Sequence, residues 1–335
     1  MATRRAVDLR CGVVTLPTAP GITWRAVTPD DAEGLAAHTR RIHDEERLHF
    51  VPGPTFFRWV MNQAEMNPET DWRVAVDEEG RIVADGGAWI HITDEGGRVF
   101  IWAETGPGHH ELERGLLDWA HRRALTALDG TPTGLSRTIR VPSEEHRSRH
   151  RAVIEATGFE VGRSFVTMER SLDGLPGARP LPGGVTAVPW GPDLSEGVRL
   201  ANNASFADHW GSLPVGEEQW RTHYVDSEAF RPDLSFLALA GGEVVSICLC
   251  EVDEEANADK GVAEVYIERV GTIREHRGAG IASHLVVRSM EAAAAAGLER
   301  AVLEVDETSH TGATEVYRKL GFEVESRTLH YLREL

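Results

Sequence analysis

The sequence predicts an α/β protein of the α+β mixed-sheet type, with two tandem domains that each hold a mixed, mostly antiparallel sheet flanked by helices. The chain has 335 residues, of which 41% are hydrophobic and 26% charged, so each half can bury a core of its own. A segment rich in proline and glycine divides the chain near its middle. Apolar strands, glycines and helical segments before this division recur after it in the same order.

The division lies at residues 173–184, where three prolines and four glycines rule out a helix or a central strand. We therefore expect an N-terminal domain over residues 1–175, a linker over 176–184 and a C-terminal domain over 185–335. The repeat is seen in Gly158-Phe159, which returns as Gly321-Phe322. The same spacing places residues 72–76 on residues 235–239.

Each element of the second half follows from a local pattern. The two runs of β-forming residues joined by Gly241-Gly242 predict a hairpin, and glycines 297 and 321 are placed to end helices. In order, we expect a strand at 185–188, a helix at 194–209, a loop at 210–215, a helix at 217–225, strands at 235–240 and 243–252, a strand at 262–272, a helix ending near 296, a strand at 300–305, a helix at 312–320 and a strand from 322.

Charge and composition limit the kinds of partner. The net charge is −18, whereas proteins that follow a phosphate backbone are usually basic, so we expect no nucleic-acid partner. No apolar run approaches a membrane span, and no apolar segment follows Arg4 and Arg5 as in a signal peptide. With three cysteines, a disulfide framework is excluded, and we expect a cytoplasmic protein without a membrane partner, either a monomer or a homodimer. The acidic charge suits a cationic substrate, but it is equally typical of a protein that is simply soluble.

The segment with the clearest chemistry is Arg277-Gly278-Ala279-Gly280-Ile281-Ala282, which follows a predicted strand and begins a helix. Glycines at 278 and 280 allow close approach of a ligand to the backbone, and free N–H groups at a helix start favour a pyrophosphate. Arg277 can add a charge-assisted contact. The segment lacks the third glycine of a dinucleotide fingerprint and the Gly-Lys-Ser/Thr of a Walker A loop.

This turn resembles the Arg/Gln-x-x-Gly-x-Gly/Ala signature of the GCN5-related N-acetyltransferases (GNAT), and residues 309–322 resemble the family's C-terminal motif. The resemblance covers residues 185–335 well and the first half weakly. The tandem layout is similar to that of the mycothiol synthase-like actinobacterial acetyltransferases. The resemblance implies an acyltransferase that uses acetyl-CoA as co-substrate and needs no metal. It also implies that the enzyme acetylates a primary amine of a small molecule by direct attack in a ternary complex. A non-catalytic acyl-CoA sensor and a protein-lysine acetyltransferase remain alternatives.

The resemblance also implies roles for individual residues. Tyr317 stands at the family's acid position, although a core aromatic would show the same helical spacing. The period of two places Glu264, Tyr266, Glu268 and Val270 on one strand face, so Glu268 and Glu264 are candidate bases. The same two carboxylates could equally be a solvated or salt-bridged pair without a catalytic role, and a substrate amine can lose its proton to water. Contacts to acetyl-CoA are expected from Val270, Thr272, Arg277, Gly278, Ala279, Gly280, Ile281, Ala282 and Ser309, the last where family members often carry Asn.

Three further expectations complete the reading. His209, Trp210 and His223 are candidates for the acceptor pocket or for packing. Cys248 and Cys250 lack further ligands at zinc spacing, so we expect core thiols and no metal. In the first half, Leu117 stands where Gly280 stands in the second, and its side chain would fill the space of the phosphates. The N-terminal domain is therefore expected to be a degenerate copy that scaffolds or covers the substrate.

Overall fold

The computed structural model describes residues 15–132, 134–209, 212–308 and 312–335. The first half contains β1 (Thr23–Ala26), α1 (Ala32–Glu46), α2 (Pro54–Met61), α3 (Pro68–Asp71), β2 (Trp72–Val76), β3 (Ile82–Thr93), β4 (Gly96–Thr105), α4 (Glu113–Leu128), β5 (Ser136–Glu144), α5 (Ser148–Ala156) and β6 (Glu160–Ser171). The second contains β7 (Val185–Pro189), α6 (Ser195–Phe206), α7 (Glu217–Trp220), a π-helix (Arg221–Val225), β8 (Phe236–Ala240), β9 (Glu243–Glu251), α8 (Glu254–Lys260), β10 (Glu264–Thr272), α9 (Ile281–Ala295), β11 (Arg300–Asp306), α10 (Ala313–Lys319) and β12 (Glu323–Glu334).

The predicted elements of the second half are present at nearly the predicted positions. Gly241 and Gly242 both have positive φ, as the tight turn of the β8–β9 hairpin requires. The prediction missed α8. Its signals are in the sequence, because the Asp253 side chain caps the helix at Ala256 N (2.8 Å) and Gly261 ends it with a φ of 67°.

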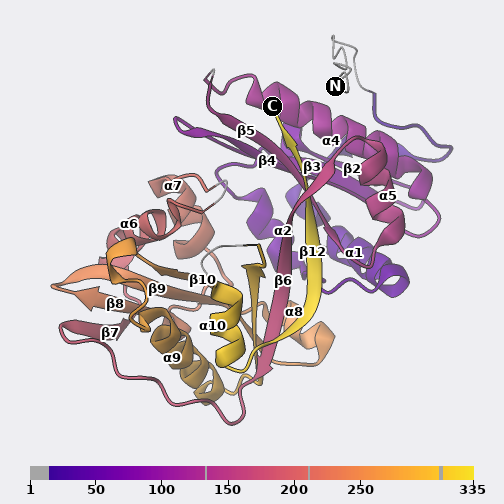
Figure 1. The fold of residues 1–335 in the computed structure, drawn as a ribbon. Helices are drawn as coiled ribbons and strands as arrows, with labels where there is room; N and C mark the ends of the chain where they lie inside the picture. The colour runs from indigo at the N-terminus through magenta and orange to yellow at the C-terminus, as the bar shows by residue number, and fades with distance from the viewer. Residues whose placement is uncertain (1–14, 133, 210–211, 309–311) are drawn as a thin grey trace, which may run out of the picture.

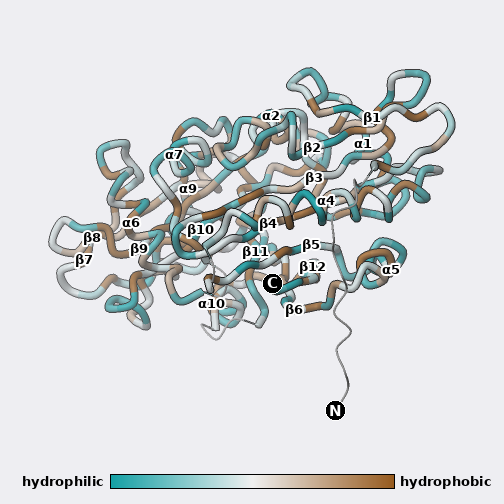
Figure 2. The backbone as a smooth tube through the Cα atoms, turned by 90° about the horizontal axis from the view of Figure 1, so that it is seen from above, coloured by the Kyte–Doolittle hydropathy of each residue, from teal (hydrophilic) through white to brown (hydrophobic). Residues whose placement is uncertain are grey.

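All strands belong to one sheet, in the order β1-β2-β3-β4-β5-β12-β6-β11-β10-β9-β8-β7. β4 pairs with β5 in parallel, β10 pairs with β11 in parallel, and the other neighbours are antiparallel. The prediction of a mixed, mostly antiparallel sheet flanked by helices is confirmed. Figure 2 shows β7 and β8 at one end of the molecule and β1 near the other.

The two halves exchange their last strands. β12, from the second half, lies between β5 and β6, and β6, from the first half, lies between β12 and β11. In Figure 1 the two strands run side by side where the two groups of helices meet. The predicted linker, residues 176–184, contains no helix or strand and joins β6 to β7. The division of the chain into two domains stays a prediction, but the sheet itself is continuous across it.

Helices cover both faces of the sheet in each half. In the second half, Ile247 and Leu249 face α6 and the π-helix, whereas the alternate residues Cys248 and Cys250 face α9 and α10. Both thiols are buried and free, as expected of core cysteines. Within the described part of the chain, no helix combines the length and the apolar character that a membrane crossing requires.

Candidate active site at the β10–α9 turn

The turn before α9 has the backbone that a ligand cradle needs. Gly278 and Gly280 both have a φ of 77°, which strongly favours glycine, and an added Cβ at either position would meet no atom within 4 Å. Gly280 is the N-cap of α9, and no side chain of the described residues caps this helix end. The first-turn N–H groups, beginning with Ile281 and Ala282, therefore lack intrahelical acceptors, and the space beside Gly278 and Gly280 is open. The arrangement fits a pyrophosphate.

The side chain of Arg277 is held by other protein groups. Its guanidinium donates to both carboxylate oxygens of Asp208 (2.6 and 2.9 Å), and its Nε and Nη2 donate to the carbonyls of Thr272 (3.0 Å) and Ser205 (2.9 Å). The hydrogen bond from Arg277 lowers the pKa of Asp208 to about 2. Arg277 thus links the turn to the end of α6, and a phosphate contact of its side chain would compete with Asp208.

Next to the turn, β10 and β11 separate. Their parallel pairing covers only residues 264–266 of β10, so the rest of β10 has a free edge on the β11 side. The N–H of Ile273 donates to Val245 O on β9 (3.0 Å). Because successive N–H groups of a strand point to opposite edges, those of Thr272 and Val270 point to the free edge. Gly271 lies between them, where α6 packs so closely that an added Cβ would lie 2.8 Å from Ser205 Cβ.

A β-bulge changes the expected face pattern of β10. The register against β9 shifts between Ile267 and Arg269, so one residue, Glu268, is extra. Glu268 and Arg269 contact the π-helix side of the sheet, whereas Val270 packs against the core on the α9 side. The expectation that Val270 shares a face with Glu264, Tyr266 and Glu268 is therefore wrong, because a strict period of two does not continue through a bulge.

Tyr317 lies on α10, 9% exposed, in the core beneath α9. Its ring stands 5.9 Å from that of Phe322, edge to face. Among the described residues, none forms a hydrogen bond with its hydroxyl. Burial, and next the nearby Cys248 thiol, raise the pKa of this phenol, so it is protonated at neutral pH. Tyr317 can therefore pack in the core with its ring and still donate a proton from its hydroxyl, so the two interpretations of the sequence do not exclude each other.

The two predicted carboxylates of β10 have different surroundings. Glu264, at the start of the strand, accepts from Lys260 Nζ (2.9 Å) and from Arg300 Nη1 (3.3 Å). Glu268, at the bulge, has its Oε1 3.8 Å from His223 Nε2 and 3.9 Å from Arg269 Nε. Burial would raise the pKa of Glu268, but His223 and Arg269 outweigh it, and the pKa is lowered.

Two carboxylates that the sequence reading did not select flank Glu268. Burial, reinforced by the Glu268 charge, raises the pKa of Glu251 on β9 to about 8 and that of Glu304 on β11 to about 7. Glu251 Oε1 is buried without a hydrogen-bond partner among the described residues. Glu304 is exposed by its accessible surface, although the protein atoms packed around its carboxyl group raise its pKa. In the parallel register that pairs Tyr266 with Val302, Glu304 stands opposite Glu268, just beyond the point where the two strands part.

The first half of the chain contributes to the same region. Trp59 on α2 donates from Nε1 to His223 O (3.4 Å), and the two rings lie 4.8 Å apart. Gln63 Nε2 donates to Thr222 O (3.3 Å). Both contacts fall on the π-helix, a geometry often found at functional sites. His223 is thus brought to Glu268, while the ring of His209 lies edge-on to that of Phe206, with 4.8 Å between the ring centroids. Trp210 and Ser309 lie outside the described residues.

The corresponding place in the first half is filled by protein. α4 already includes Arg114 and Gly115, so these two residues do not form a turn in front of the helix as Arg277 and Gly278 do. A Cβ on Gly115 would lie 2.8 Å from the Pro17 ring, and Pro17 O accepts from Trp24 Nε1 (2.7 Å). The segment around Pro17 therefore covers the helix start that α9 leaves open.

A buried ion pair occupies the separation between β4 and β5. These strands pair only from Gly96 to Phe100, and Glu104 near the end of β4 accepts two bonds from Arg147 (2.9 and 2.6 Å). The Arg147 side chain is 5% exposed and also binds Glu46 (2.6 Å). Burial would raise the pKa of Glu104, but the Arg147 charge outweighs it and lowers that pKa to about 2. This half offers charged protein groups where the second half has an open strand edge.

Comparisons with known proteins agree with this geometry. Residues 200–322 match the family model described as acetyltransferase (GNAT) family. The mycothiol acetyltransferase of Streptomyces griseus subsp. griseus is 30% identical over 330 residues, which cover 90% of this chain and 98% of that protein.

Solved structures share the whole fold. A GCN5-related N-acetyltransferase from Sphaerobacter thermophilus superposes with a TM-score of 0.74 at 22% identity, covering 96% of this chain and 97% of that one. A tandem GNAT protein from the clavulanic acid biosynthesis pathway superposes with a TM-score of 0.66 at 15% identity, covering 93% and 98%. The chain belongs to the GNAT family as a tandem N-acetyltransferase that resembles the mycothiol acetyltransferases.

Proposed function

We propose that this chain transfers the acetyl group of acetyl-CoA to a primary amine of a small molecule, by direct attack in a ternary complex at the β10–β11 separation. The observation that carries the proposal is the continuity of three features: the open N-terminus of α9, the free edge of β10 and the carboxylates at its bulge. A mycothiol acetyltransferase that is similar over 90% of the chain supports a small acceptor.

The co-substrate is proposed to bind along the free edge of β10. Residues 278–282 receive the pyrophosphate on backbone N–H groups for which the described part of the chain provides no acceptor. The N–H groups of Val270 and Thr272 point toward the thioester and stabilise the oxyanion that forms when the amine attacks. Tyr317 then protonates the departing thiolate, a role that suits a phenol whose pKa is raised.

We propose that the three carboxylates near the bulge, Glu268, Glu304 and Glu251, have different roles toward the acceptor amine. Glu268 has a lowered pKa and is charged at neutral pH, so it attracts the ammonium form of the acceptor. Glu304, with a pKa of about 7, is matched to accept the proton that the ammonium loses. Glu251 has a pKa of about 8 and is mostly protonated at neutral pH. Glu264 keeps its salt bridges and supports the start of β10 rather than the reaction.

Replacing Glu304 with glutamine is expected to change the pH profile. The base acts when deprotonated, so kcat/KM of the native enzyme rises with pH through about 7 and then levels off. In Glu304→Gln this rise disappears, and kcat/KM at high pH falls about 100-fold. Steady-state kinetics between pH 5.5 and 9 measure both effects. Glu299→Gln, at an exposed carboxylate outside the region, is the matched control, and an unchanged profile in Glu304→Gln would remove Glu304 from the mechanism.

An amine panel tests the proposed function itself. Contacts of Trp59 and Gln63 with the π-helix close the acceptor side with residues of both halves, which favours a compact acceptor over a peptide. We expect acetylation of small primary amines, measured by release of the CoA thiol, and no acetylation of lysine peptides. Tight acetyl-CoA binding without turnover on any amine would favour the sensor, and turnover on peptides alone would favour the protein-lysine acetyltransferase. We further propose that the enzyme is cytoplasmic and works as a monomer or homodimer.

A further inference from the structure

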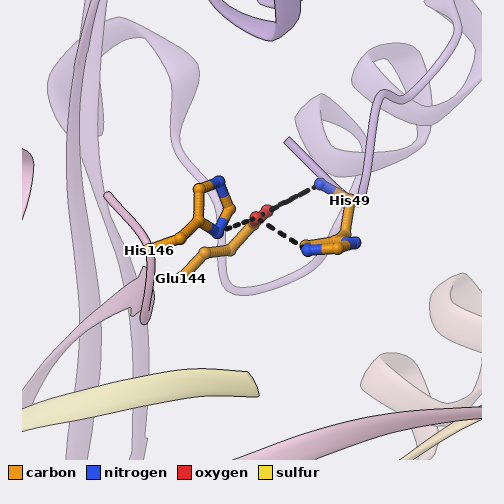
Figure 3. A group of neighbouring side chains, drawn as sticks. All are labelled: His49, Glu144 and His146. Carbon is orange, nitrogen blue, oxygen red and sulfur yellow. Dashed lines mark hydrogen bonds and ion pairs between the residues drawn. The ribbon is translucent and has the colours of Figure 1, made fainter. Parts of the chain in front are cut away.

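Two histidines and a glutamate gather in the first half, away from the acetyl-transfer region. His49 lies between α1 and α2, Glu144 ends β5 and His146 follows it (Figure 3). Their ligand atoms all lie within 4.8 Å of one another. Glu144 Oε2 is 3.9 Å from His49 Nε2 and 3.6 Å from His146 Nδ1. Small side-chain rotations would bring these atoms to the edge length of a zinc coordination tetrahedron, about 3.4 Å for bonds of about 2.1 Å.

In each of the two imidazoles, the ring nitrogen that points away from Glu144 already has a hydrogen-bond partner. His146 Nε2 lies 2.8 Å from the carbonyl oxygen of Glu46, which only accepts, so Nε2 carries the proton. His49 Nδ1 lies 2.8 Å from a carboxylate oxygen of Glu325 and is the donor for the same reason. In the neutral imidazoles, the lone pairs are then on His49 Nε2 and His146 Nδ1, the two nitrogens nearest Glu144. A carbonyl or carboxylate behind each ring is the usual outer support of a metal-binding histidine.

The fold holds these groups by features of its own. α1 ends at Glu46, and the next residue, Arg47, has a left-handed φ of 58°. His43 Nδ1 lies 2.8 Å from Leu48 O, and together these features turn the chain toward β5. The backbone N–H of His49 then donates to both oxygens of Glu144 (3.0 and 3.2 Å). Glu325 lies at a register shift of β12, and a bulge of this kind re-aims a side chain.

We propose that His49, Glu144 and His146 bind a divalent transition-metal cation of the zinc type, with a water in the fourth position. Two imidazoles and one carboxylate suit Zn²⁺ and its neighbours, whereas Mg²⁺ and Ca²⁺ prefer sites built from oxygen. The cation joins the α1–α2 connection to β5, and through Glu325 to β12. This site is distinct from the cysteine pair, for which the sequence predicted no metal, and the proposal does not depend on the proposed acetyl transfer.

The bound cation has a structural consequence for α2. The connection that carries His49 leads directly into α2, whose Trp59 contacts His223 beside Glu268. Fixing the connection at one end therefore limits the movement of the helix that covers the acceptor side. The cation acts here as a positioning element and takes no part in the reaction.

Titration of untagged, metal-stripped protein tests the site. Calorimetry with ZnCl₂ is expected to give one site per chain that a large excess of MgCl₂ does not block. Co²⁺ in its place should give the intense visible absorption of a tetrahedral complex. His146→Gln should weaken Zn²⁺ binding at least 100-fold, and Glu325→Ala 10- to 100-fold through the lost support of His49.

An exposed histidine–glutamate pair elsewhere supplies the control. His110 Nε2 lies 3.2 Å from Glu45 Oε1 on the same half, and His110→Gln should bind Zn²⁺ like the native chain. Absence of stoichiometric Zn²⁺ binding by the native protein would overturn the proposal, whatever the variants do. Equal binding by the native chain, His146→Gln and His110→Gln would overturn it as well. Circular dichroism of each variant excludes loss of the fold as the cause of weaker binding.

Discussion

Tyr317→Phe is expected to lower turnover about 100-fold or more while the affinity for acetyl-CoA stays nearly unchanged. The hydroxyl is the part of the side chain without a hydrogen-bond partner among the described residues, and its raised pKa keeps the proton available. Removing it takes away the proposed acid, which typically contributes at least two orders of magnitude. The ring keeps its packing beside Phe322, so the core is preserved. Single-turnover kinetics and calorimetry with acetyl-CoA separate the two quantities.

Tyr331→Phe is the matched control for this experiment. Tyr331 is fully buried, but its hydroxyl donates to Glu155 (2.7 Å) and accepts from Arg151 (3.0 Å) in the first half. Its loss should reduce thermal stability and leave kcat of the folded enzyme intact. If Tyr317→Phe also keeps its turnover, Tyr317 is a core aromatic and the acid lies elsewhere.

Gly280→Leu is expected to weaken acetyl-CoA binding about 100-fold or more. The substitution gives the second half the residue that the first half carries at Leu117. Its side chain would enter the open space in front of the first turn of α9, where the pyrophosphate is proposed to bind. A φ of 77° adds roughly 1 kcal/mol of backbone strain for a residue with a Cβ. Calorimetry with acetyl-CoA measures the loss of affinity.

Gly242→Leu separates strain from blocked binding. Gly242 has a φ of 91°, is also free of neighbours and lies in the β8–β9 hairpin turn, outside the proposed site. Both variants should lose a comparable amount of thermal stability, but only Gly280→Leu should lose acetyl-CoA. Equal affinity in the two variants would show that the phosphates do not bind at the α9 turn.

Local patterns accounted for most of the fold. The hairpin, the glycine-ended helices and the α9 turn each depend on residues close in sequence, and each is present. The continuous sheet could not be foreseen in this way, because β6 and β12 choose their neighbours through contacts between the two halves. The amphipathic pattern of a strand predicts which of its faces is buried, but it does not predict which other strand will pair with that strand.

In the candidate site, too, the sequence identified the residues that depend on local patterns and missed the features that depend on contacts distant in sequence. The glycines of the turn are identified by type and spacing, whereas the bulge at Glu268 depends on the register against β9. Glu304 did leave a signal, as the one charged residue in the apolar run from Ala301 to Val305. A carboxylate that interrupts such an apolar run is a candidate functional group. His223 was a candidate for the acceptor pocket from its position in the sequence, but its contact with Trp59 of α2 had no comparable signal.

The order of the strands has a consequence for how the protein is made. During synthesis β5 leaves the ribosome long before β12, so the first half cannot complete its sheet while the second is being translated. The edge of β5 then exposes unpaired backbone groups, a known template for aggregation. We expect the nascent first half to depend on chaperones, and the closing of the sheet to be a slow, late step because it joins strands far apart in sequence. The two similar halves of the chain therefore cannot complete their folding one after the other.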